Sequence, residues 1–282
     1  MSNIRMLMKN LWDDAAVSVT TGALVPTLPL TSSQVYGRSL TAGITPDGTG
    51  KSAVQFNLDG FFLVDGLVIY RHWLSSGALW RLELFDGINC AGNKVYDSGE
   101  IEAVQTKNLG ELMWLADPLV ATIFETWPFK FSQLWLAEPL YAHSGRITLI
   151  DTLSRDGIHE FDRVYLGHSI QPGVNFNWGA EHAWQSNEQP KRSAGGSVFA
   201  AEKQRLRQFS FELAYLVEEE RPHVSEGIKH VGLSRDWFIS LYPGNGGQKE
   251  IEYAMACKFQ SLPPLAGSAF NNYQTRISVQ EA

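Results

Sequence analysis

Residues 53–60 read Ala-Val-Gln-Phe-Asn-Leu-Asp-Gly, and residues 79–86 read Leu-Trp-Arg-Leu-Glu-Leu-Phe-Asp. Apolar side chains occupy every second position in both stretches: Val54, Phe56 and Leu58, then Trp80, Leu82 and Leu84. A period of two puts the apolar side chains on one buried face of a strand, as in an antiparallel sandwich. The chain is therefore predicted to be mainly β and to begin with a jelly-roll β-sandwich.

Turn signals recur between the alternating stretches and support the same fold class. They are Pro46-Asp47-Gly48, Asp59-Gly60, Asp65-Gly66, Asp86-Gly87 and Ser98-Gly99. Short strands separated this often are typical of sandwiches and jelly rolls. Residues 118–139, which contain Trp127-Pro128, are expected to form irregular edge structure.

Glycine, serine and proline cluster at residues 167–173, which places a domain junction there. Residues 1–167 form the first predicted domain and residues 168–282 the second. The second domain is predicted as a β-sandwich or barrel with one flanking helix. Its apolar rows are residues 174–178, 209–215 and 251–259, taken at every second position. The helix is expected at 218–231, with Gly232 as its cap.

The 282 residues carry a net charge of −7, which argues against a basic grip on nucleic acid. Residues 1–165 hold 12 Lys and Arg against 18 Asp and Glu, whereas residues 166–282 are nearly neutral. The longest apolar run, residues 112–124, is too short to span a bilayer, so no membrane insertion is expected. We see no signal peptide. Cys90 and Cys257 are interpreted as independent thiols, although a disulfide stays open.

No motif for catalysis or for a cofactor is recognised. Residues 48–52, Gly-Thr-Gly-Lys-Ser, resemble the end of a phosphate-binding loop, but Thr45 stands where that motif needs glycine. The histidines lack metal-binding spacing, and no Gly-x-Ser-x-Gly elbow is present. Pairs of acids such as Asp151 and Asp156 leave a hydrolase open, because sequence does not show how far apart they lie. We therefore assign no catalytic residue, no metal site and no cofactor.

Two groups of residues are candidates for binding. The polar segment 185–205 is long for a hairpin connection, and long loops are usually functional. Its candidates for contact between subunits are Lys191, Arg192, Gly195, Gly196, Lys203 and Arg205. A solvated loop is the alternative. The candidate glycan contacts are His72, Trp73 and Asn93, which lie in or beside two loops, and a structural plug is the alternative for Trp73.

Several stretches resemble known families. Residues 53–60, 64–70 and 79–86 resemble successive strands of the galactose-binding-like, or discoidin-type, jelly roll, and residues 95–100, 146–151 and 161–167 continue the resemblance. Residues 10–14, with 28–30 and Arg38-Ser39, are similar to the start of tail structural proteins of tailed bacteriophages. The order of elements in 168–282 is similar to the tail-tube-like fold of phage tube, distal-tail and baseplate ring subunits.

This resemblance implies a non-enzymatic virion structural protein of a phage tail tip or baseplate. The protein would be a homo-oligomer: copies of its second domain would form a ring, expected to be a hexamer. The ring would join the tail tube to distal tail proteins. The protein would be assembled in the host cytoplasm and reside in the virion. The alternative is a glycan-binding host-attachment module that contacts a host surface glycan, and the third interpretation is a cell-wall or capsule hydrolase.

Overall fold

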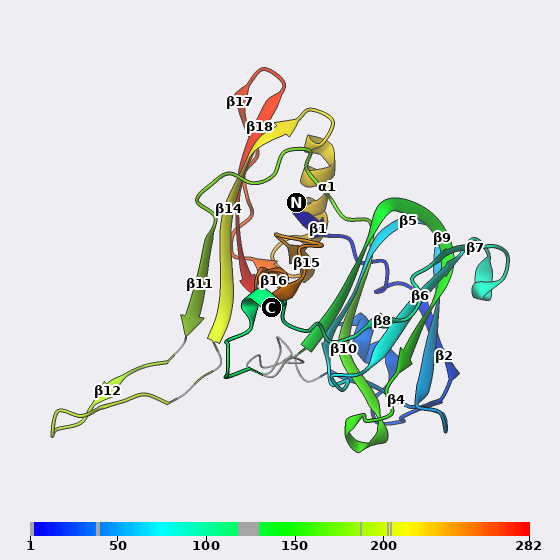
Figure 1. Cartoon of the computed structure of the whole chain (residues 1–282). Helices are drawn as coiled ribbons and strands as arrows, with labels where there is room; N and C mark the ends of the chain where they lie inside the picture. The colour runs from blue at the N-terminus through cyan, green and yellow to red at the C-terminus, as the bar shows by residue number, and fades with distance from the viewer. Residues whose placement is uncertain (1–2, 38–39, 118–129, 187, 202, 204) are drawn as a thin grey trace. The chain divides into compact units, whose positions relative to one another are not determined.

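The computed structural model describes residues 3–37, 40–117, 130–186, 188–201, 203 and 205–282. The described chain is mainly β, as the alternating pattern predicts (Figure 1). It divides into two compact units: Met1–Gln171 with Trp237–Ala254, and Pro172–Asp236 with Met255–Ala282. Arg38, Ser39, and the part of the predicted irregular structure at 118–129 lie outside the described residues.

The first unit is built on two long antiparallel strands, β5 (Lys51–His72) and β9 (Lys130–Ile150), which pair with each other. Its other strands are β1 (Arg5–Leu7), β2 (Ala16–Thr21), β3 (Ala23–Leu24), β4 (Ala42–Thr45), β6 (Leu79–Phe85), β7 (Lys94–Asp97), β8 (Ile101–Glu102), β10 (His159–Gly167) and β15 (Trp237–Ser240). Its helical elements are the 3-10 turns η1 (Leu30–Gln34), η2 (Ile88–Cys90), η3 (Leu109–Glu111) and η5 (Arg155–Gly157), and the short helix α2 (Gly247–Glu252).

Both long strands contribute to both layers of a sandwich. Residues 51–57 of β5 pair with β2 and with residues 144–150 of β9, which also pair with β6. Residues 66–72 of β5 pair with β10 and with residues 130–135 of β9. The apolar core joins residues from all these segments, for example Phe56, Ile69, Leu82 and Val164. The sandwich predicted for the N-terminal half is therefore present.

Two of the predicted turns do not end a strand. Asp59-Gly60 and Asp65-Gly66 lie inside β5, where the pairing register with β9 shifts. Bulges of this kind bend a strand without ending it, so a glycine within a strand pattern need not be a turn. Residues 130–139 were expected to be irregular, but they form the first half of β9. Both expectations were wrong for the same reason, because local breaker residues are accommodated within long paired strands.

The segment Trp237–Ala254 belongs to the first unit, whereas the sequence-based division assigns it to the second domain. Its strand β15 pairs with β1. Phe238 packs against Tyr70 and Tyr165, with ring centroids 6.1 and 5.7 Å away. Aromatic packing between residues far apart in the chain thus decides where this segment belongs, and sequence order does not show it.

The second unit is a sheet with β14 (Arg205–Val217) between β11 (Glu181–Ser186) and β18 (Asn272–Glu281). Strand β18 also pairs with β16 (Ala254–Phe259) and β17 (Ala266–Ala269). Strands β12 (Lys191–Arg192) and β13 (Val198–Phe199) form a separate pair. The predicted row on β14 is buried from Phe209 to Leu213. Tyr215 is exposed instead, because the register shifts between Leu213 and Leu216.

The predicted flanking helix is confirmed as α1 (Arg221–Val231) and ends at Gly232, whose φ is 58°. Two other expectations in this region were wrong. Residues 174–178 form no strand, and Ile251 lies in α2 and not on the strand that follows it. Cys90 and Cys257 are free thiols, as the interpretation of two independent thiols predicts.

Candidate functional site

His72 is not at the surface, so the prediction that it contacts a glycan needs correction. Only 2% of the residue is exposed, and its Nε2 lies 2.8 Å from Ser132 Oγ. Burial, with a contribution from nearby Lys130, lowers the pKa of His72 from 6.5 to about 3. The imidazole is therefore a neutral interior group, and a ligand cannot reach it.

Trp73 and Asn93 are exposed but lie at different ends of the strands. Asn93 binds Asp86 through its backbone N–H and its amide, at 2.7 and 3.0 Å, where β6 ends beside Ser144 of β9. Trp73 lies near the opposite end of β9, because Ser75, two residues later, donates its backbone N–H to Asp151, which directly follows β9. Six residues of strand separate these ends, which is about 20 Å. The structure therefore does not bring the predicted glycan contacts into one site.

Three amide side chains do come together, at the loop that follows β6. Asn89 donates its backbone N–H to Asn57 Oδ1 at 2.8 Å and accepts at Oδ1 from Asn57 Nδ2 at 2.9 Å. Gln55 Nε2 also donates to Asn89 Oδ1, at 3.2 Å. Asn89 has a φ of 57°, a left-handed conformation that asparagine tolerates better than most residues. Ser144 Oγ extends the support by accepting from the Cys90 N–H and donating to the Gly87 carbonyl.

Exposed aromatic residues follow these amides along β5, which carries Gln55 and Asn57, and lie on its partner strand β9. Phe61 and Tyr141 are 59% and 62% exposed, and the His143 ring stands edge-on to Phe61 at 5.1 Å. Phe62 packs on the core, so Phe61 points to solvent, as Asn57 does next to the core residue Phe56. We call Asn57, Phe61, Asn89, Tyr141 and His143, together with Gln55, which is only 9% exposed and supports Asn89 from below the surface, the amide–aromatic surface.

A network of charges borders this surface on the β6 side. Glu83 and Asp97 are bridged by Lys94, whose Nζ lies 2.8 and 2.7 Å from their carboxylates. Arg81 pairs with Asp97 as well, at 2.8 Å from its Nε. Arg81, and to a smaller extent Lys94, hold the pKa of Asp97 well below its usual range, because they bond the ionised carboxylate. Arg146 of β9 lies next to this network, with its Nη1 4.0 Å from Glu83.

The predicted subunit-contact residues lie on or beside the two-stranded arm of β12 and β13 (Figure 1). The segment 185–205 is therefore not one long loop: Gln185 and Ser186 end β11, and Arg205 begins β14. Lys191 and Arg192 form β12 and face Phe199 and Val198 across the pair. Gly195 and Gly196 lie in the connecting turn, where Gly196 has a φ of 85°. The Lys203 N–H lies 3.4 Å from a Glu188 carboxylate oxygen.

A serine–histidine pair besides His72 and Ser132 also has the contact distance of a catalytic dyad but lacks access to solvent. Ser52 Oγ lies 2.7 Å from His159 Nδ1, and both residues are at most 1% exposed. Asp151, which sequence analysis considered for a carboxylate pair, is occupied in accepting bonds from Ser75 and from the Leu153 N–H. The bonds of Ser52, His159 and Asp151 therefore stabilise the end of the sandwich where β5 begins and β9 ends.

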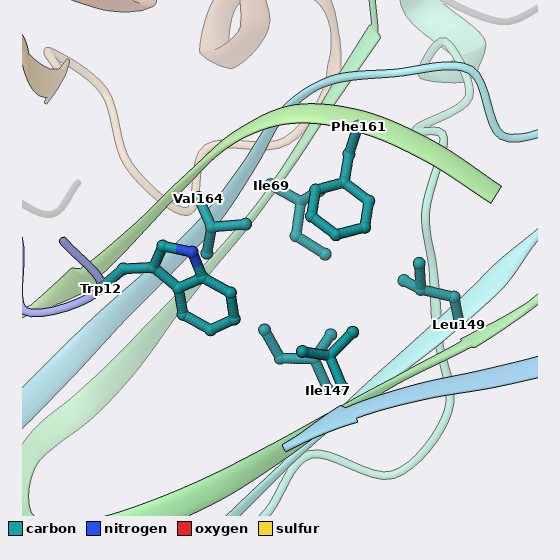
Figure 2. Close-up of a pocket in the computed structure, with 7 residues that line it drawn as sticks. Trp12, Ile69, Ile147, Leu149, Phe161 and Val164 are labelled. Atoms are coloured by element: carbon teal, nitrogen blue, oxygen red, sulfur yellow. The ribbon is translucent and has the colours of Figure 1, made fainter. Parts of the chain in front are cut away.

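A small cavity lies in the core of the first unit (Figure 2). Its lining is entirely apolar and comprises Trp12, Val54, Ile69, Ile147, Leu149, Phe161 and Val164. Polar groups that could orient a ligand are missing from this lining, so the cavity is a packing defect of the core.

Within the described chain, no helix has the length and hydrophobicity to cross a membrane. The same residues contain no group of three or more His, Cys, Asp or Glu arranged for a metal ion.

Sequence analysis missed most of the amide–aromatic surface. It identified the loop that contains Asn89 but proposed Asn93 from it. Asn57 lies 32 residues from Asn89, and alternation shows it only as a polar position on a strand. Phe61 and Tyr141 are aromatic residues in strand regions, which are buried in most cases. The one available signal in the sequence was the aromatic pair Phe61-Phe62, which follows the predicted turn Asp59-Gly60.

No family model and no curated protein sequence matches this chain. Parts of it are similar to solved structures of carbohydrate-active proteins. A chitosan-binding module of a chitosanase/glucanase from Paenibacillus sp. IK-5 matches with 7% identity and a TM-score of 0.39, over 57% of this chain and 99% of the module. The family 32 carbohydrate-binding module of Clostridium perfringens NanJ, in complex with galactose, matches with 11% identity and a TM-score of 0.38, over 58% and 98%. A Ruminococcus gnavus fucosidase in complex with fucose matches with 12% identity and a TM-score of 0.40, over 58% of this chain but 27% of the enzyme.

Proposed function

We propose that the first unit is a non-catalytic glycan-binding module and that the amide–aromatic surface holds the sugar. The observation that carries this proposal is the reciprocal bonding of Asn57 and Asn89, which fixes three amides beside two exposed aromatic rings. Amides supply both donors and acceptors for hydroxyl groups, and an aromatic face covers the apolar face of a sugar ring. A surface fixed before binding loses little conformational entropy when the ligand arrives.

The geometry distinguishes this surface from the one at Trp73. Trp73 is 39% exposed, but its companion His72 is interior and no amide cluster is bonded beside it among the described residues. Phe61 and Tyr141 are more exposed and lie next to donors and acceptors held in place. The site therefore moves from the end of the sandwich to the bend where β5 and β9 pass between layers.

The test compares these two places in one protein. A panel of bacterial surface oligosaccharides is screened on an array, and hits are titrated by calorimetry against wild type, Phe61→Ala, Tyr141→Ala and Trp73→Ala. The first two substitutions are expected to weaken binding at least about tenfold, a change of about 1.4 kcal/mol. Trp73→Ala serves as the matched aromatic control and is expected to bind as wild type. An array without signal, or loss confined to Trp73→Ala, would refute the proposal.

A second candidate function is the virion structural role that the sequence resemblance implies, with self-assembly through the second unit. The arm supports it, because Val198 and Phe199 are 58% and 64% exposed on a pair of two-residue strands. A two-stranded hairpin is marginal alone in water, so a neighbouring molecule that covers these side chains would stabilise it. Sugar binding by the first unit and assembly by the second are compatible, since they use different residues.

Sedimentation tests the second candidate. The full chain is expected to form a concentration-dependent oligomer, and replacement of residues 189–200 by a short Gly-Ser linker is expected to convert it to monomer. Phe199→Ser, a change on the arm alone, should weaken assembly in the same direction. A monomer at all concentrations, both alone and with tail proteins, would contradict this role.

A further inference from the structure

We propose that the glycan bound at the amide–aromatic surface carries an anionic group, which pairs with Arg146. This inference rests on the proposed function and specifies the class of ligand. Arg146 lies on β9 between Gln55 of β5 and Glu83 of β6, its direct partners across the two strand pairs. It is therefore the cation adjacent to the amide cluster on the outer face of the sheet.

The local balance of charges leaves Arg146 with the weakest pairing. Three cations, Arg81, Lys94 and Arg146, share two carboxylates, Glu83 and Asp97. Lys94 bonds both carboxylates within 2.8 Å, and Arg81 forms a two-point contact with Asp97. Arg146 reaches only Glu83, at 4.0 Å, which is too long for a hydrogen bond. A third carboxylate, Glu100, also acts on Arg81, so the charges of this network balance and Arg146 is distinguished by its loose pairing.

The guanidinium of Arg146 has both the exposure and the support to receive an anion. Its side chain is 38% exposed, while its Nε is buried and has no hydrogen-bond partner in the described structure. The Arg146 side chain also interacts with the thiol of Cys90, the residue after Asn89 in η2, where it partly opposes the rise in the pKa of Cys90 that burial causes. Arginine binds a carboxylate or sulfate through two parallel bonds, which gives it specificity for planar or multidentate anions.

The chain as a whole disfavours a densely charged ligand. Its net charge of −7 repels a polyanion such as nucleic acid, whose binding requires many basic contacts. One loosely paired cation next to three amides and two aromatic rings instead fits a sugar that carries a single acidic group. A carboxylate on a uronic acid and a sulfate ester share this chemistry.

Calorimetric titration with three probes tests the inference. The probes are a uronic-acid oligosaccharide, its carboxyl-reduced neutral form, and a sulfate ester of the neutral form. Wild type is expected to bind at least one anionic probe about tenfold or more tightly than the neutral one, with affinity falling as NaCl rises from 50 to 300 mM. Arg146→Gln is expected to remove this preference and its salt dependence. Arg81→Gln, which removes a cation already paired with Asp97, is the control and should keep the preference.

The outcomes separate this inference from the function on which it rests. Preference for the uronic acid or for the sulfate ester, lost in Arg146→Gln, supports it and identifies the anion. Equal binding of all three probes, unchanged by Arg146→Gln, overturns the anionic ligand but leaves a neutral glycan site intact. If Phe61→Ala and Tyr141→Ala also bind every array hit as wild type does, the amide–aromatic surface itself is refuted.

Discussion

Asn57 and Asn89 bind each other in both directions: the Asn89 backbone N–H donates to Asn57 Oδ1 at 2.8 Å, and Asn57 Nδ2 donates to Asn89 Oδ1 at 2.9 Å. The two residues come from a long strand and from the 3-10 turn η2, 32 positions apart. This reciprocal contact connects the loop to the sheet and gives the proposed binding surface its shape.

A double-mutant cycle on this pair tests its role. Asn57→Ala is expected to lower the free energy of unfolding by about 1 kcal/mol, because two solvent-exposed hydrogen bonds are lost. Asn89→Ala keeps its backbone N–H donor and removes the Asn57 Nδ2–Asn89 Oδ1 bond, so the double variant should cost less than the sum because both single changes remove that bond. Urea denaturation measures all four proteins. Additive effects would show that the pair does not act as a unit.

The interior position of His72 predicts a dependence of stability on pH. The pKa of His72 falls from 6.5 in the unfolded chain to about 3 in the fold, chiefly because burial disfavours the charged form. Its contribution to stability is therefore complete above pH 6.5 and is lost as the pH falls from 6.5 towards 3. His72→Gln keeps a donor for Ser132 but does not titrate. Urea midpoints at pH 7, 5 and 4 should fall more steeply for wild type than for this variant, and parallel curves would contradict the assignment.

The buried carboxyl of Asp162 predicts the opposite dependence of stability on pH. Burial raises the pKa of this carboxyl from 3.8 to about 6, while a bond from Thr41 Oγ1 at 2.8 Å partly opposes the shift. Its favourable contribution is therefore complete below pH 3.8 and is lost as the pH rises through 6. Asp162→Asn keeps an acceptor for Thr41 and stays neutral. It is expected to raise the urea midpoint at pH 8 and to leave it unchanged at pH 4.

Asp162→Ala is the matched control, because it removes the acceptor as well as the charge. It should fall below Asp162→Asn at every pH. A lower midpoint for Asp162→Asn at pH 8 would show that the ionised carboxylate, with Arg71 4.0 Å away, stabilises the fold instead.

The apolar cavity in Figure 2 predicts a stabilising substitution. Val164→Ile adds one methylene group to the lining, and filling an empty apolar space gains about 0.8 kcal/mol per methylene. Val164→Ala, which enlarges the same cavity, should cost about 2 kcal/mol or more. Thermal unfolding of both variants checks the pair. A lower melting temperature for Val164→Ile would mean that the lining cannot accommodate the added atoms.

Sequence periodicity predicts the elements whose burial alternates regularly. It gives β6, the buried part of β14, and helix α1 with its glycine end, because each of these has one apolar face and a local stop signal. It fails at β5, where Gly60 and Gly66 are read as turns. A Cβ on Gly66 would lie 2.4 Å from the Trp135 ring, so this glycine serves close packing within a continuous strand. Only the partner strand reveals that reason.

The candidate site was harder to predict than the fold. The sequence pattern does not distinguish one polar residue on the solvent-exposed face of a strand from another, and no local pattern indicates that Asn57 bonds to Asn89. His72 was proposed because it precedes an exposed tryptophan. The chain instead turns its imidazole inward to Ser132. Long-range hydrogen bonds select which polar side chains stay available, and these bonds form only in the fold.

The return of Trp237–Ala254 to the first unit has a consequence for biosynthesis. Phe238 completes an aromatic cluster with Tyr70, Tyr165 and Phe131, so the first unit lacks part of its interior until this segment has been made. Domains generally fold as units while the chain emerges from the ribosome, the N-terminal one first. Here that order cannot hold fully, since residue 254 of 282 belongs to the unit that starts first. The first unit must therefore remain incompletely folded until residue 254 has been translated.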